Sequence, residues 1–120
     1  MGDLKTYTGS CHCGVVRFSF NCPEITEGRR CNCSICIRKG AIMSVPYFSP
    51  GQFNFVEGLD ALTNYQWGDK DVNHWFCKYC GIYPFHDGPA RPGYYRVNLG
   101  CVNELDPLAL NIELIDGQSY

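Results

Sequence analysis

Nine cysteines in a chain of 120 residues, most of them in tight clusters, constrain this sequence more than any other feature. One cluster is the pair Cys77 and Cys80, followed directly by Gly81. The two-residue spacing lets both sulfur atoms turn toward one ion, and glycine accepts the backbone angles that such a turn requires. Because a tetrahedral structural zinc needs four ligands, two more donors must come from elsewhere. The sequence therefore predicts a metal knuckle that recruits a distant segment.

The best second pair lies near the start of the chain, where Cys11 and Cys13 are followed by Gly14. A closed site of four thiolates contributes to folding and leaves no position open for chemistry. Buried free thiols are the alternative, since cysteine is among the residues most often buried. Two clustered pairs, each next to a glycine, favour the metal. The ion would then clamp an N-terminal hairpin to the centre of the fold.

A third cluster, between these two in the sequence, has three cysteines: Cys31, Cys33 and Cys36. Three protein ligands plus a water or substrate make the pattern of a catalytic zinc site. A thiol that takes the fourth position would be held as its thiolate, because metal coordination deprotonates it. The alternative is a closed site with a fourth protein ligand. The candidates for that ligand are Cys101 first, and then His12, Cys22 and His86.

Disulfides are the competing explanation for so many cysteines. The opening residues lead into no apolar segment of a secretory signal, and the total is odd. Clustered spacings also favour chelation, so we expect a reduced, cytoplasmic metal protein, with zinc or iron as the ion. The net charge of −2 argues against a general nucleic-acid binder, and no apolar run has the length of a membrane span. The oligomeric state is not indicated.

The hydrophobic pattern predicts a single all-β domain over residues 1–120. Val16, Phe18 and Phe20 alternate with Arg17 and Ser19, which is typical of a half-buried strand. Further strands are expected at 41–45, 53–56, 61–67, 72–76, 82–85, 94–99 and 108–114. One or two helical turns are expected at 33–39. Polar connections are expected at 24–30, 68–71 and 87–93. About eight short strands with little helix indicate an all-β fold.

Three motifs carry a resemblance to a known family. They are Gly9-Ser10-Cys11-His12-Cys13-Gly14, Cys31-Asn32-Cys33-Ser34-Ile35-Cys36 and His74-Trp75-Phe76-Cys77-Lys78-Tyr79-Cys80-Gly81, and Val97-Asn98-Leu99-Gly100-Cys101 follows them. In order and spacing they resemble the glutathione-dependent formaldehyde-activating enzyme family, which includes centromere protein V. The resemblance implies an Mss4-like (β-tent) fold of short antiparallel strands stapled by two zinc ions. It places a structural zinc on the two outer cysteine pairs and a second, catalytic and more labile zinc on the central three cysteines.

Two functions follow from this resemblance. The first is a zinc-dependent carbon–sulfur lyase of the S-(hydroxymethyl)glutathione synthase type, which joins glutathione to formaldehyde or a related aldehyde. Arg38 and Lys39 would then bind the carboxylates of the thiol, or would only offset the charge of the thiolates, as Arg29 and Arg30 nearby also could. The second is a non-catalytic zinc-stapled module that binds a protein partner. A deep pocket beside the three cysteines would favour the enzyme, and a flat apolar patch the module.

Overall fold

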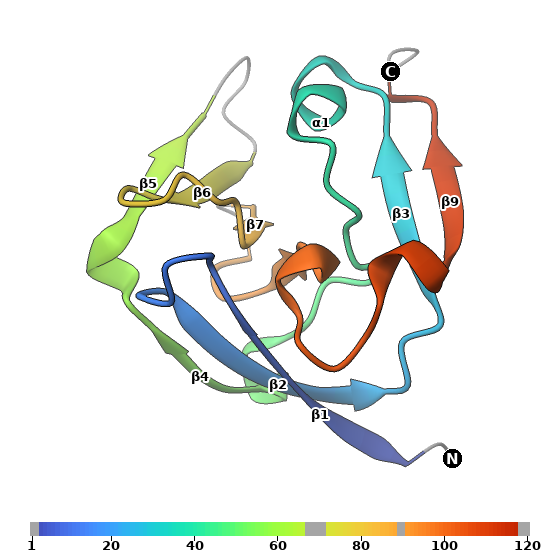
Figure 1. Cartoon of the computed structure of the whole chain (residues 1–120), viewed down its shortest axis with the longest axis horizontal. Helices are drawn as coiled ribbons and strands as arrows, with labels where there is room; N and C mark the ends of the chain where they lie inside the picture. Colours follow the sequence, from blue (N-terminus) through green and yellow to red (C-terminus); the bar gives the residue numbers. More distant parts are fainter. Residues whose placement is uncertain (1–2, 67–71, 89–90, 118–120) are drawn as a thin grey trace.

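The computed structural model describes residues 3–66, 72–88 and 91–117, and consists mostly of short strands (Figure 1). The strands are β1 Leu4–Ser10, β2 Arg17–Pro23, β3 Glu27–Cys31, β4 Phe53–Glu57, β5 Leu62–Tyr65, β6 Asn73–Cys77, β7 Phe85–Asp87, β8 Tyr95–Val97 and β9 Asn111–Ile115. A single α-helix of the described residues, α1 at Ser34–Lys39, lies between β3 and β4 in the chain. Single 3-10 turns occur at Pro50–Gln52, Leu59–Ala61, Leu99–Cys101 and Pro107–Ala109.

The strands form three small sheets around one core. Two are antiparallel, in the orders β1-β2-β4 and β5-β6-β7-β8, and the third is the pair β3-β9. In Figure 1 the first sheet crosses the bottom of the molecule, the second stands at the left, and β3 with β9 stands at the right beside α1. The all-β architecture predicted from the sequence is therefore confirmed, as is the helix predicted at 33–39.

Aromatic side chains join the sheets in the core. Phe18 on β2 meets Phe85 on β7 edge to face, with ring centroids 5.7 Å apart. Phe20, two residues along β2, stacks on Phe48 at 4.7 Å. Arg17 points the other way and pairs with Glu57 of β4 at 2.7 Å. Such aromatic pairs contribute about 0.5–1.5 kcal/mol beyond the area that they bury, so they set how the first sheet meets the second.

Several strand boundaries differ from those predicted. The hairpin around the second cysteine pair forms as expected, but β6 covers 73–77 and β7 begins at 85, where the predicted strand ended. The predicted strands at 94–99 and 108–114 are shortened by 3-10 turns to 95–97 and 111–115. β5 covers 62–65 of the predicted 61–67, of which Trp67 lies outside the described residues, as do the turn at 68–71 and residues 89–90 of the predicted loop.

Two other predictions of secondary structure were wrong. The strand expected at 41–45 is absent, because Met43 makes only isolated bridges, to Arg29 on one side and to Asn98 on the other. The polar connection expected at 24–30 contains β3, which pairs in parallel with β9 through its backbone. Both errors concern pairing between distant segments, which local patterns do not encode. The sequence analysis gave no range for β1, the first strand of the N-terminal hairpin, which pairs with β2 along its whole length.

None of the helices in the described part of the chain is long and apolar enough to cross a membrane.

Two glycines with positive φ provide a test of the β2–β4 packing. Gly58 ends β4 at φ 80°, and a Cβ built there would meet the backbone oxygen of Val15. Gly40 ends α1 at φ 65°, and nothing lies within 4 Å of its built Cβ. Gly40→Ala should therefore cost only the backbone strain of about 1–2 kcal/mol. Gly58→Ala should cost about 1–3 kcal/mol more, because the backbone of Val15 must move.

Thermal unfolding of both variants measures this difference directly. Equal melting temperatures for Gly40→Ala and Gly58→Ala would contradict the close approach of Gly58 to Val15.

Candidate metal centres

Four cysteines from two distant turns bring their sulfur atoms together. The Sγ atoms of Cys11, Cys13, Cys77 and Cys80 all lie within 4.8 Å of one another, and we call this set the four-cysteine cluster. The Sγ of Cys13 lies 3.6 Å from that of Cys11 and 3.7 Å from that of Cys77. A tetrahedral ion with metal–sulfur bonds of about 2.3 Å requires sulfur atoms roughly 3.8 Å apart. The cluster therefore has the spacing that a zinc ion needs.

Each cysteine pair lies on a tight turn that a glycine closes. In the first turn the N–H of Gly14 donates to the carbonyl of Cys11, three residues earlier, at 3.2 Å, and in the second that of Gly81 donates to the carbonyl of Cys77, four residues earlier, at 2.8 Å. Both glycines have positive φ, 85° and 77°, which glycine adopts without steric cost. Cys11 and Cys77 are almost fully buried. The structure thus brings the predicted knuckle at Cys77 and Cys80 together with the second cysteine pair that the sequence analysis favoured.

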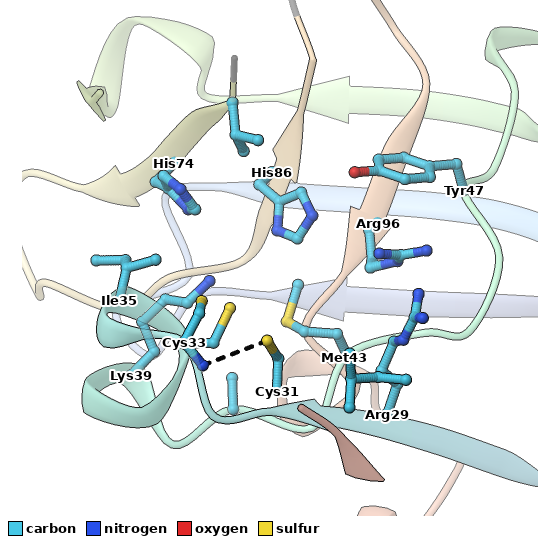
Figure 2. A pocket seen from close by; sticks show the side chains of 14 residues that line it. Arg29, Cys31, Cys33, Ile35, Lys39, Met43, Tyr47, His74, His86 and Arg96 are labelled. Atoms are coloured by element: carbon cyan, nitrogen blue, oxygen red, sulfur yellow. Dashed lines mark hydrogen bonds between the residues drawn. The ribbon is translucent and has the colours of Figure 1, made fainter. Parts of the chain in front are cut away.

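A second set of sulfur atoms lies at the junction of β3 and α1. The Sγ atoms of Cys31, Cys33 and Cys36 lie within 4.8 Å of one another, and this three-cysteine cluster has no fourth member among the residues that the structure describes. Cys31 ends β3, Cys33 caps α1 and Cys36 lies within the helix. The N–H of Cys33 donates to the sulfur of Cys31 at 3.4 Å (Figure 2). A metal with one remaining coordination position fits this donor set.

The three-cysteine cluster opens into a cavity of about 500 Å³. The cysteines and Lys39 form one wall, and the β6–β7 hairpin provides His74 and His86 opposite (Figure 2). The remaining lining residues are Arg29, Ile35, Ala41, Met43, Tyr47, Val72, Arg96 and Ile115. None of the four-cysteine cluster lines this cavity. A ligand in the cavity can therefore reach the three-cysteine cluster but not the four-cysteine cluster.

Three cationic side chains that line the cavity each have a buried nitrogen atom with no hydrogen-bond partner among the described residues. These atoms are Nε of Arg29, Nζ of Lys39 and Nε of Arg96. The Nε of Arg29 lies 3.5 Å from a carboxylate oxygen of Glu113, an ion pair without hydrogen-bond geometry. Burial lowers the pKa of Lys39, while the three cysteines oppose this shift. Because a buried unpaired donor costs about 1–3 kcal/mol, this arrangement suits an anion in the cavity.

Arg96 is held in place by its neighbours. Its Nη2 donates to the carbonyl of Val45 at 2.9 Å, and its guanidinium lies 4.3 Å from the ring centroid of Tyr47. The sequence analysis did not single out Arg96. The available signal was that Arg96 is the one charged residue in the strand predicted at 94–99.

The other predicted residues divide between the cavity and the outside. Lys39 lines the cavity. Arg38 is exposed, and its Nη1 donates to the carbonyl of Ser34 one helical turn earlier at 2.8 Å. Arg30 is also exposed, whereas its neighbour Arg29 lines the cavity.

None of the four candidates for a fourth ligand joins the three-cysteine cluster. The buried thiol of Cys101 donates to the backbone oxygen of Tyr83 at 3.8 Å. Burial raises the pKa of Cys101 to about 12, and the charges of Cys11 and Cys80 add to the shift, which places it on the side of the four-cysteine cluster. His12 is exposed, Cys22 belongs to the aromatic core, and His86 lines the cavity.

The fold and its clusters define an all-β domain with two groups of cysteines suited to metal ions. The sequence matches the family described as glutathione-dependent formaldehyde-activating enzyme over residues 6–115, and the chain belongs to this family. It is also similar to the crystal structure of a Rhodobacter sphaeroides protein that was a Northeast Structural Genomics target. That protein is 33% identical, with a TM-score of 0.73, and the match covers 88% of this chain and 99% of the other.

Loss of a ligand should have different consequences at the two clusters. The four-cysteine cluster joins segments far apart in the chain, so its ion is coupled to folding. We expect Cys80→Ala to give unfolded or insoluble protein. Cys33→Ala should remain folded and lack one metal ion, and a chelator should remove that same ion first from the unmodified protein. Metal analysis and circular dichroism measure both properties, and equal destabilisation by the two substitutions would contradict the assignment.

Gly117 gives a milder test of the three-cysteine cluster. A Cβ built on Gly117 would lie 2.5 Å from Sγ of Cys31 and 3.0 Å from Cβ of Cys33. Gly117→Ala should therefore displace the sulfur of Cys31 and weaken zinc binding at this cluster by about tenfold or more. Gly51→Ala is the matched control, because the built Cβ only touches the hydroxyl of Ser49 at 3.8 Å. Competition with a chromophoric chelator compares the two, and identical zinc affinity in both variants would refute the contact.

Proposed function

We propose that this protein is a zinc-dependent carbon–sulfur lyase of the S-(hydroxymethyl)glutathione synthase type. It would join the thiol of glutathione to formaldehyde or a related aldehyde. The observation that carries the proposal is the cavity, because it combines an accessible cluster of three cysteines with three cationic side chains. Its volume of about 500 Å³ lies within the range of small-molecule sites, roughly 300–1,000 Å³. Membership of the family supports the same chemistry.

The three cysteines would hold the zinc and leave one position for the substrate sulfur. When bound there, the ion lowers the pKa of a coordinated thiol and polarises a carbonyl as a Lewis acid. The protein itself must orient the thiol and exclude competing ligands. The half-buried positions of Cys31, Cys33 and Cys36 support this role, since all three line the cavity.

The cationic side chains would bind the carboxylates of the thiol substrate. Of the two residues expected from the sequence, this proposal retains Lys39 and adds Arg29 and Arg96, because these three line the cavity. Offsetting the charge of the cysteines is the alternative role for these cations, and it suits Lys39, on which all three cysteines act. Burial lowers the pKa of Arg96 and the neighbouring Arg29 lowers it further, while Tyr47, Cys36 and Glu113 oppose the shift, so of the three cysteines only Cys36 acts on Arg96. Two guanidinium groups held near each other favour an anion between them, and a carboxylate matches their geometry.

Binding of the thiol should depend on its sulfur and on these cations. Glutathione should bind, and S-methylglutathione should bind at least about tenfold more weakly, because a thioether cannot become a thiolate. Affinity should rise with pH toward the thiol pKa of about 8.5, because coordination releases a proton. Calorimetry on the zinc-loaded protein measures both effects. Equal affinity for the two peptides would exclude sulfur coordination.

Two adjacent arginines, Arg29 and Arg30, provide a variant and its matched control for testing carboxylate binding. Arg29→Gln removes a guanidinium from the cavity, whereas Arg30→Gln removes an exposed one. We expect the first to weaken glutathione binding by about 10- to 100-fold, the range of a charged hydrogen bond, and the second to change little. NMR detection of the hemithioacetal formed with formaldehyde then tests the reaction. Binding without faster adduct formation would leave a thiol-binding protein, and no binding at all would favour the non-catalytic module.

A further inference from the structure

A hydroxyl group bridges the two histidines on the cavity wall opposite the three cysteines. The hydroxyl of Tyr83 lies 2.9 Å from Nδ1 of His74 and 2.6 Å from Nδ1 of His86. His74 on β6 and His86 on β7 are paired residues of neighbouring strands, with ring centroids 5.6 Å apart. Both imidazoles are buried and line the cavity (Figure 2). Because both Nδ1 atoms are occupied by Tyr83, the Nε2 atoms are left for the cavity.

Because the Tyr83 hydroxyl has a single proton, the two histidines must be different tautomers. Tyr83 donates to one Nδ1 and accepts from the other, so one ring carries its proton on Nδ1 and the other does not. Burial, followed by the charge of Lys39, lowers the pKa of His74 to about 4, and lowers that of His86 to about 2. Both rings are therefore neutral near pH 7. One Nε2 is then a proton acceptor, and the other Nε2 is a donor.

We propose that His74, Tyr83 and His86 form a proton relay that serves both ends of the addition of a thiol to an aldehyde. The proposal rests on the proposed function. That reaction releases a proton from sulfur and requires one at the carbonyl oxygen. The relay provides an acceptor and a donor within one cavity, and Cys31 and Cys33 lie across that cavity from both histidines (Figure 2).

The relay balances the reaction. The S–H bond breaks on coordination and its proton passes to water in the cavity. During the addition the sulfur electron pair forms the new C–S bond, and the free Nε2 takes up a proton from that water. The π electrons of the carbonyl move to its oxygen, which takes the proton from the other Nε2. Between the rings, Nδ1–H of the first histidine passes its proton to the Tyr83 oxygen, and the hydroxyl passes its own proton to Nδ1 of the second.

After the transfer, each histidine has the tautomer that the other had before, and neither ring is charged. This arrangement of protons is the one from which the reverse reaction would start. Proton exchange between the rings and water in the cavity restores the original tautomers. Of the groups that face the relay, the cations Lys39 and Arg96 disfavour an imidazolium at His86, whereas Cys36 and Asp87 place negative charge near Tyr83. Lys39 lies 3.8 Å from the ring centroid of Tyr83, Arg96 lowers the pKa of His86 as Lys39 does, and the Tyr47 ring packs edge-on against His86 at 5.7 Å.

Tyr83→Phe tests the relay, because it removes the bridging oxygen and keeps the ring. NMR exchange spectroscopy on glutathione and formaldehyde with the zinc-loaded protein gives the rate of adduct formation. We expect Tyr83→Phe to bind glutathione as the unmodified protein does but to lose about 100-fold of the acceleration, a typical contribution of acid–base catalysis. Tyr65→Phe, at an exposed position on β5, should keep the full rate.

No acceleration by the unmodified protein would overturn the proposed function and the relay's role with it. Acceleration that survives Tyr83→Phe would overturn the relay alone.

His86→Asn separates the relay from a structural role of this histidine. The asparagine amide can contact the Tyr83 hydroxyl from near the position of Nδ1 but offers no group in place of Nε2. We expect a folded protein that binds zinc and glutathione and has lost the acceleration. Full acceleration in His86→Asn would show that the Nε2 of His86 takes no part and would refute the relay, which needs both rings.

The tautomers can be observed without any substrate. Nitrogen-15 NMR of histidine-labelled protein should show one buried ring protonated at Nδ1 and the other at Nε2, with the exposed His12 as internal reference. This opposed pair should disappear in Tyr83→Phe. The same tautomer in both rings, or an imidazolium at pH 7, would overturn the relay whatever the activity.

Discussion

The four-cysteine cluster is the constraint on which the rest of the structure depends. It joins the turn between β1 and β2 to the turn after β6, and its bridging sulfur atoms belong to residues 64 positions apart. A domain of 120 residues buries a modest fraction of its surface, so a metal that ties two sheets together replaces part of the core that a larger protein would have. With the turns fixed, Phe18 of β2 meets Phe85 of β7 in the centre of the molecule.

The same constraint reaches the cavity through β6. This strand begins next to His74 and ends at Cys77, so an ion bound by Cys77 would also anchor the strand that carries one wall of the cavity. The opposite wall is held differently, by β3, α1 and the parallel partner β9. The two halves of the candidate active site thus belong to separate substructures. Their relative position is set by the aromatic core between them and not by the metal sites alone.

What could be predicted from the sequence was local. Both cysteine clusters follow from spacings of two or three residues, and each knuckle is closed by hydrogen bonds within five residues. Arg96 and the Tyr83 bridge were missed because they depend on which strands become neighbours. Cys101 was a reasonable fourth ligand by residue type, yet its distance from the three-cysteine cluster is decided by the turn at Leu99–Cys101. The pattern of residue types thus indicates metal chemistry, whereas the acid–base groups emerge only from the pairing of β6 with β7.

The parallel pair β3–β9 has a consequence for biosynthesis. Cys31, at the end of β3, stands beside Ile115 in the register, and the N–H of Asn32 donates to the carbonyl of Ile115 at 3.1 Å. All ligands of the four-cysteine cluster precede residue 81, so they emerge from the ribosome before β9, which the β3–α1 junction needs as its neighbouring strand. If structure forms as the chain emerges, the four-cysteine cluster can close before the β3–β9 pair completes the surroundings of the three-cysteine cluster.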